Sequence, residues 1–127
     1  MKLTEYRLYG QVSAGGAKTL TSESAVFGLL YAVQWIDGTL ANSNTAVLSS
    51  INSEGAETLL TLGAGEGDAD VKYYPRALAC DNAATALTGT AGGDRVCPLV
   101  WGTLQLVIAS GGTSTYGGCI CYVQESE

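Results

Sequence analysis

Apolar side chains recur at every second residue along much of this chain, and this alternation is the strongest constraint on its fold. One face of an extended segment at 25–37 (AVFGLLYAVQWID) would carry Phe27, Leu29, Tyr31, Val33 and Trp35. Successive side chains of a β-strand point to opposite faces, whereas an α-helix repeats every ~3.6 residues. The alternation therefore predicts a long strand with this aromatic face toward the core.

Other segments show the same period. In TEYRLYGQV, one side would carry Tyr6, Leu8 and Val12, and the other Glu5, Arg7 and Gln11. TLQLVIA would turn Leu104, Leu106 and Ile108 inward, and GCICYVQ would form a closing strand. No longer window carries the apolar stripe of an amphipathic helix.

Turn sequences separate these segments at short intervals, as in SAGGA, DGTLANSN, NSEG and SGGTSTYGG. Many short strands with regular turns are typical of β-sandwiches and jelly rolls. We therefore predict an all-β, single-domain antiparallel β-sandwich over residues 1–127, jelly-roll-like, with about eight strands. Residues 1–14 are considered as an extended N-terminal arm.

The charge pattern argues against several classes of partner. The chain has only six Lys and Arg residues, which are scattered, and a net charge of −6. Nucleic-acid binding usually needs a basic stripe that neutralises phosphates, so we expect none. No run is long and apolar enough for a transmembrane helix, and the N-terminus lacks the apolar stretch of a signal peptide. We therefore expect no membrane partner. We also expect the protein to be made and used without export.

Four cysteines are present: Cys80, Cys97, Cys119 and Cys121. In a reducing cytosol we expect free thiols packed as small apolar groups. Cys119 and Cys121 would share one face of a strand, so a disulfide from either to Cys80 or Cys97 stays an alternative. A zinc site is disfavoured because the chain has no C-x-x-C spacing and no histidine.

The absence of histidine also excludes Ser-His-Asp and Cys-His catalytic groups. Most acidic residues fall in turns, and none lies in the apolar core of a strand, where its pKa would be raised. We expect no enzyme and no cofactor. The segment GAGEGDAD raises a weak calcium candidate at Glu66, Asp68 and Asp70, but it lacks the twelve-residue calcium-loop pattern. Solvated turn carboxylates are the favoured interpretation.

The segment YYPR is the best candidate for a binding surface. Tyr and Arg are enriched at protein interfaces, and Pro75 marks a strand edge or bulge. By alternation, one of Tyr73 and Tyr74 should be in the core and the other at the surface, with Arg76 on the side of Tyr74. Strand packing, protein contact and stacking on sugars or bases are the three interpretations. The two tryptophans, Trp35 and Trp101, are expected in the core.

The order of these segments resembles that of a family of small virion proteins of tailed bacteriophages. The resemblance runs through GLLYAVQWIDGTL, SSINSEGAETLLTL, YYPR, AATALTGTAGGD and GTLQLVIASGGTSTYGGCICYV. It covers most of the chain and lies in the pattern of strands and turns, without a catalytic motif.

The resemblance implies a capsid decoration, or cement, protein. Such a protein would be all-β and homotrimeric, made in the host cytoplasm and located on the exterior of the virion. It would bind the major capsid protein where capsomers meet and stabilise the shell. Tyr73, Tyr74 and Arg76 are the first candidate contact set, and Lys2, Tyr6 and Arg7 are the second.

Two other roles stay open. The protein could be a tail or head-fibre component of the virion. It could also be a carbohydrate-binding attachment module, because β-sandwiches host such sites and fold does not decide function.

Overall fold

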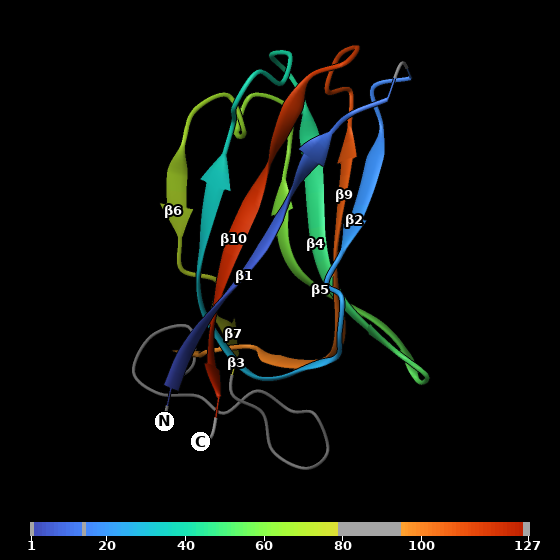
Figure 1. Ribbon diagram of the computed structural model, residues 1–127. Coiled ribbons are helices and arrows are strands. Elements are labelled where there is room, and N and C mark those ends of the chain that lie inside the picture. Colours follow the sequence, from blue (N-terminus) through green and yellow to red (C-terminus); the bar gives the residue numbers. More distant parts are fainter. Residues whose placement is uncertain (1, 14, 79–94, 126–127) are drawn as a thin grey trace.

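The computed structural model describes residues 2–13, 15–78 and 95–125, and these residues form an all-β fold (Figure 1). The strands are β1 (Lys2–Gln11), β2 (Lys18–Thr21), β3 (Val26–Ile36), β4 (Thr45–Asn52), β5 (Gly55–Leu62), β6 (Val71–Tyr73), β7 (Ala77–Leu78), β8 (Arg95–Val96), β9 (Leu99–Ala109) and β10 (Tyr116–Glu125). None of the described segments forms a helix that could cross a lipid bilayer.

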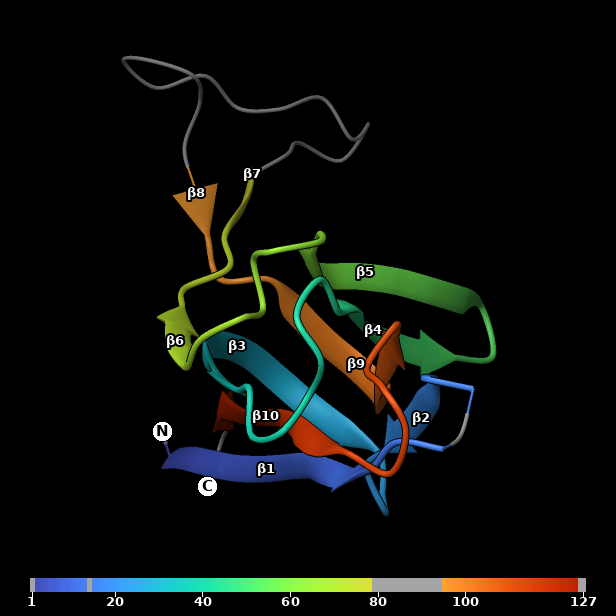
Figure 2. The same cartoon turned by 90° about the horizontal axis from the view of Figure 1, so that it is seen from above.

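Eight of the strands form one antiparallel sheet that folds into two layers (Figure 2). One layer has the order β1-β10-β3-β6 and the other β2-β9-β4-β5, and pairing between β3 and β9 joins them. Counted along the chain, the first, eighth, third and sixth of these strands make one layer, and the second, seventh, fourth and fifth make the other. This is the strand order of a jelly roll. The predicted antiparallel sandwich is confirmed.

The N-terminal stretch lies within this sheet. β1 pairs with β10 along its whole length, from Lys2 opposite Glu125 to Gln11 opposite Tyr116. The stretch considered as an arm, residues 1–14, therefore contains a strand of the first layer. Strands β7 and β8, which lie between β6 and β9 in the sequence, form a separate two-stranded sheet.

Strand β9 serves both layers because it bends at Gly102. Its first residues pair with β3, and its later residues pair with β4 and β2. Gly102 has a positive φ of 122°, and a Cβ added there would collide with the carbonyl oxygen of Ile51. Only glycine adopts this conformation without strain. The bend is therefore encoded at this position.

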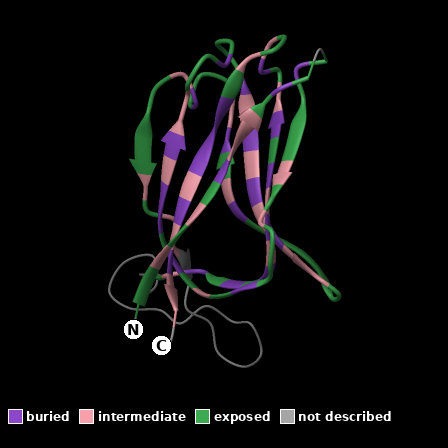
Figure 3. Ribbon diagram, viewed as in Figure 1, coloured by how far each residue is buried: buried purple, intermediate pink, exposed green. Residues whose placement is uncertain are grey.

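The core lies between the two layers, where buried residues line the facing sides of the strands (Figure 3). The predicted alternation of the segment TEYRLYGQV is confirmed, because Leu8 and Val12 are buried and Tyr6 packs against the core. The inward positions predicted for β9 are also confirmed by the burial of Leu104, Leu106 and Ile108.

The prediction for β3 is half wrong. Val33 and Trp35 are buried as predicted, but Phe27, Leu29 and Tyr31 are exposed. The reason is a β-bulge. β3 pairs with β10 through Ala32–Tyr122 and then through Leu30–Val123, so that Tyr31 is an extra residue. A bulge of this kind shifts the alternation by one position. Before it, the inward residues of the strand include Val26 and Leu30.

The cysteines agree with the expectation of free thiols where the structure describes them. Cys119 and Cys121 are free and buried on the same face of β10, with their Sγ atoms 3.9 Å apart. The hydrogen bond with Cys121, and next the burial, raise the pKa of the Cys119 thiol well above its usual range. Cys97 is free and half-buried. Cys80 and the segment AATALTGTAGGD lie outside the described residues.

Candidate functional site

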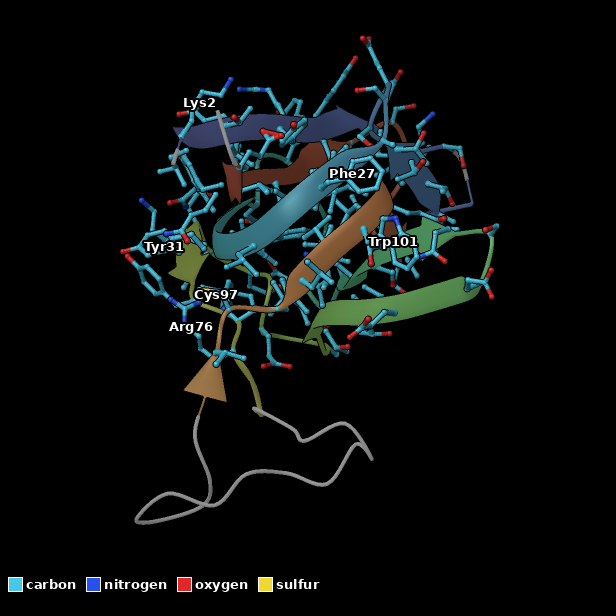
Figure 4. The ribbon with its side chains drawn as sticks, turned by 90° about the horizontal axis from the view of Figure 1, so that it is seen from below. Lys2, Phe27, Tyr31, Arg76, Cys97 and Trp101 are labelled. Atoms are coloured by element: carbon cyan, nitrogen blue, oxygen red, sulfur yellow. The ribbon has the colours of Figure 1, made fainter. Side chains whose placement is uncertain are left out.

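Four large apolar side chains lie exposed together where β3 pairs with β9. Phe27 is opposite Trp101, and Leu29 is opposite Leu99. The exposed fractions are 56% for Phe27, 52% for Trp101, 36% for Leu29 and 57% for Leu99. Seen from below, Phe27 and Trp101 lie side by side on neighbouring strands (Figure 4). We call these four residues the β3–β9 patch. Single exposed apolar residues are ordinary, but a contiguous group of this kind is typical of an interaction surface.

Trp101 was expected in the core, and that prediction is wrong. It lies on the outer face of β9, whereas Val100 and Leu104 lie on the inner face and are buried. The inward assignment of Leu104, Leu106 and Ile108 already implied this. Trp101 is an odd number of residues away from each of them, so on one strand it faces the opposite side. Trp35, the other tryptophan, is buried as expected, and its indole N–H donates to the backbone oxygen of Gly67 at 2.9 Å.

A second group lies further along β3, around Tyr31. The rings of Tyr31 and Tyr74 meet edge to face, with centroids 5.9 Å apart, and the Arg76 guanidinium lies 5.6 Å from the Tyr31 centroid. Arg76 also donates from Nη1 to the backbone oxygens of Tyr31, at 3.0 Å, and Pro75, at 2.6 Å. We call Tyr31, Tyr74 and Arg76 the Tyr31 cluster. These contacts hold the two exposed rings in one arrangement.

The predicted division within YYPR is confirmed. Tyr73 packs against the core from β6, and its hydroxyl donates to the backbone oxygen of Glu66 at 3.1 Å. Tyr74 is exposed, and Arg76 lies with it at Tyr31. Tyr74 is therefore the most exposed side chain of this set, and Tyr73 is the one that packs against the core.

The N-terminal set does not form one site. The Tyr6 hydroxyl donates to the carboxylate of Glu125 at 2.9 Å, which ties β1 to β10 within the chain. The nearby Thr4 hydroxyl lowers the pKa of Glu125; burial opposes this, and Tyr6 and Lys2 add to the lowering. Burial, followed by the bond and charge of Glu125, raises the pKa of Tyr6.

The other two members of that set point to different places. Lys2 shares a groove with Leu3, Tyr31 and Gln124, so it lies beside the Tyr31 cluster. Arg7 instead covers the ring of Tyr9, with its guanidinium carbon 4.8 Å from the centroid. The structure therefore brings only Lys2 from the N-terminal set to the first candidate set.

The acidic turn stabilises loops through its carboxylates. Glu66, Asp68 and Asp70 accept backbone N–H bonds at 2.6, 3.1 and 2.8 Å, donated by Gly63, Ser43 and Asp37, respectively. Within the described ranges, no three acidic or sulfur side chains are grouped as a metal site would require. Each carboxylate thus has a structural role in holding the turn.

Asp37 lies beside two of these carboxylates. Burial, and next the charges of Asp68 and Asp70, raise the pKa of Asp37, while the nearby Asn44 side chain opposes the rise. Ionisation of Asp37 is therefore less favourable in the folded state than in the unfolded chain. This repulsion lies at the end of the sandwich where the loops at 37–44 and 63–70 meet.

No protein-family model matches the chain, and no curated protein is significantly similar to it. Function must therefore be inferred from the surface of the chain itself. The β3–β9 patch and the Tyr31 cluster lie on β3 and its neighbours, and together they form an apolar and aromatic surface with a cation at one end. Such a surface binds a partner by excluding water and by ring contacts.

Proposed function

We propose that this protein is a non-enzymatic virion structural protein of a tailed bacteriophage, and specifically a head decoration protein. It would bind the outer surface of the capsid at capsomer junctions and stabilise the shell. The observation that carries the proposal is the β3–β9 patch, where two cross-strand pairs of large apolar residues are exposed on a jelly roll. Jelly rolls are common in virion proteins, although the fold alone does not decide function.

The composition of the chain supports docking to a protein surface. Only 14% of its residues are charged, well below the roughly one quarter of an average globular chain. A surface poor in charge loses little hydration when it is covered. Many copies on one lattice also gain from avidity, so each single contact can be modest.

The partners that follow from this proposal are the major capsid protein and two further copies of the chain in a homotrimer. The β3–β9 patch and the Tyr31 cluster would contact the capsid, with Tyr74, Arg76 and Lys2 as the polar margin. The role is mechanical, because a protein that spans two capsomers resists their separation. The site would lie on the exterior of the virion.

Binding to isolated shells tests this function directly. Purified protein would be mixed with shells assembled from the major capsid protein of the same phage, and the sedimented fraction would be measured against concentration. We expect saturable binding at a fixed ratio to capsomers, and a trimer by mass in solution. Absence of the protein from sedimented shells at every concentration rejects the proposal. Density at the tail in a map of the particle would assign it to a tail or fibre component.

A paired substitution tests the Tyr31 cluster. Replacing Tyr74 and Arg76 with Ala removes the Tyr74 ring that meets Tyr31 edge to face, and the guanidinium that lies over the Tyr31 ring. We expect weaker binding to shells and an unchanged far-UV circular dichroism spectrum. The matched control replaces Arg7 with Ala, because Arg7 covers the Tyr9 ring away from the cluster. Equal shell occupancy for the paired variant and the wild type would exclude the cluster from the contact.

A carbohydrate-binding attachment module is the second candidate, and the exposed rings favour it. Phe27, Tyr31, Tyr74 and Trp101 are all at least one third exposed. Aromatic faces of this kind can stack on sugar rings. A glycan array separates the two functions, since a decoration protein gives no specific hits and an attachment module does.

A further inference from the structure

A groove of about 240 Å³ lies between Trp101 and the end of the β4–β5 hairpin. It is lined by Asn52, Glu54, Gly55, Ala56, Glu57 and Trp101. We call it the Trp101 groove. It adjoins the β3–β9 patch, because Trp101 belongs to both.

Hydrogen bonds from one side chain hold the two walls of this groove together. Asn52 donates from Nδ2 to the backbone oxygen of Trp101 at 2.8 Å, and its Oδ1 accepts the backbone N–H of Glu54 at 2.8 Å. The bend at Gly102 follows directly after Trp101. The backbone at Trp101 is therefore fixed relative to the hairpin before any partner binds, which lowers the entropic cost of binding.

The groove carries negative charge and no compensating cation. Glu54 and Glu57 line it and are exposed, and none of its lining residues is Lys or Arg. The protein as a whole has a net charge of −6. A positively charged group would therefore be attracted to the groove, and an anionic partner would be repelled.

Some surface rings of the chain are covered by its own cations, and the ring of Trp101 is not among them. Three tyrosine rings are each covered by a cation of the chain: Tyr9 by Arg7, Tyr122 by Lys72 and Tyr31 by Arg76. Among the residues that the structure describes, no Lys or Arg covers the ring of Trp101. Indole is the strongest of the natural cation–π platforms. Trp101 thus combines an uncovered ring, two nearby carboxylates and a preformed groove.

We propose that the Trp101 groove receives an arginine or lysine side chain of the partner protein. The cation would lie against the indole face while Glu54 and Glu57 neutralise it. This inference deepens the proposed function, and it rests on that function for the identity of the partner as the capsid protein. The chemistry of the groove can be tested without the capsid.

The two tryptophans of the chain provide the readout. An NMR titration would follow their ¹⁵N-labelled indole N–H signals while Nα-acetyl-arginine amide is added. The neutral isostere Nα-acetyl-citrulline amide and methyl glucoside are the comparison ligands. Trp35 is an internal reference, since its indole is buried and bonded to Gly67. We expect the Trp101 signal to move with the arginine amide, and the Trp35 signal to stay in place. A Trp101 signal that does not move, or moves equally with citrulline or more with the glucoside, overturns the proposal.

Charge-neutralising variants test the contribution of the two carboxylates. The double substitution Glu54→Gln with Glu57→Gln keeps the shape of the groove, and should weaken binding of the arginine amide about 2- to 30-fold, the range expected for two exposed ion pairs. Glu23→Gln is the control, because Glu23 lies outside the groove. Trp101→Leu should abolish the shift change caused by the arginine amide on the remaining groove signals. Unchanged affinity in the Gln variant contradicts the proposal.

Shell binding separates failure of this inference from failure of the proposed function. If the wild type binds shells and the E54Q/E57Q variant binds equally well, the groove does not hold a cation of the capsid and the inference is wrong, while the decoration role stands. If the wild type binds no shells but the arginine titration succeeds, the decoration role is wrong and the cation-binding groove stands.

Discussion

Replacing both leucines of the β3–β9 patch with threonine tests whether this surface is covered by a partner. Leu29 and Leu99 face each other across β3 and β9, and their exposed fractions together amount to nearly one whole leucine side chain. Complete burial of one leucine is worth about 1.5–3 kcal/mol. Threonine retains part of the apolar area, so we expect a loss of about 1–2 kcal/mol on docking, or about 5- to 30-fold in affinity.

The same substitutions also have a cost on folding. Each leucine is partly covered in the free chain, so the unfolding free energy should fall by about 1–2 kcal/mol. Threonine is β-branched and suits a strand, which limits the loss. A domain with a stability of about 5–15 kcal/mol stays folded after such a change. The variant can therefore be assayed as a native protein.

The assay measures shell affinity by sedimentation together with thermal unfolding by circular dichroism. The matched control replaces Val71 and Val107 with threonine, since both valines are exposed on strands outside the patch. We expect both variants to stay folded and only the leucine variant to lose affinity. Equal affinity of the leucine variant and the wild type would refute the assignment of this patch as the docking surface.

Two further predictions concern the fold. Gly102→Ala should lower the unfolding free energy by about 3 kcal/mol, because it forces a Cβ onto the carbonyl oxygen of Ile51 at a positive φ; an unchanged midpoint in urea would contradict this. Asp37→Asn should raise the unfolding free energy at pH 7, because burial and the charges of Asp68 and Asp70 raise the pKa of Asp37 and so penalise its ionised form. The stability advantage of the variant should disappear as the pH falls through the raised pKa of Asp37, because the wild-type side chain then becomes protonated. A variant no more stable than the wild type at pH 7 would contradict this prediction.

Much of the architecture could be predicted because one face of each strand packs on a single core. In β1 and in the later part of β9, period-two alternation identified the inward residues, such as Leu8 and Leu106, correctly. The prediction failed in β3 because a bulge at Tyr31 shifts the alternation, and the extra residue follows from pairing with β10. Pairing partners are distant in the sequence, so periodicity within one strand cannot reveal them.

The candidate site was only partly predictable for the same reason. Alternation separated Tyr73 from Tyr74 correctly, since both lie on one short segment. The contact of Tyr74 with Tyr31 depends on how β6 pairs with β3, which the segment YYPR does not encode. Trp101 was missed because residue type was given more weight than its parity relative to Leu104.

The pairing of Lys2 with Glu125 has a practical consequence for attaching foreign polypeptides. Lys2, Tyr31 and Gln124 border one groove, so β1 begins and β10 ends beside the Tyr31 cluster. A cargo fused at either end would crowd the docking surface and would need a long linker. The loops at 37–44 and 110–115 lie together at the opposite end of the sandwich (Figure 1). Epitopes for display on a particle should therefore be inserted there, where they would face away from the shell.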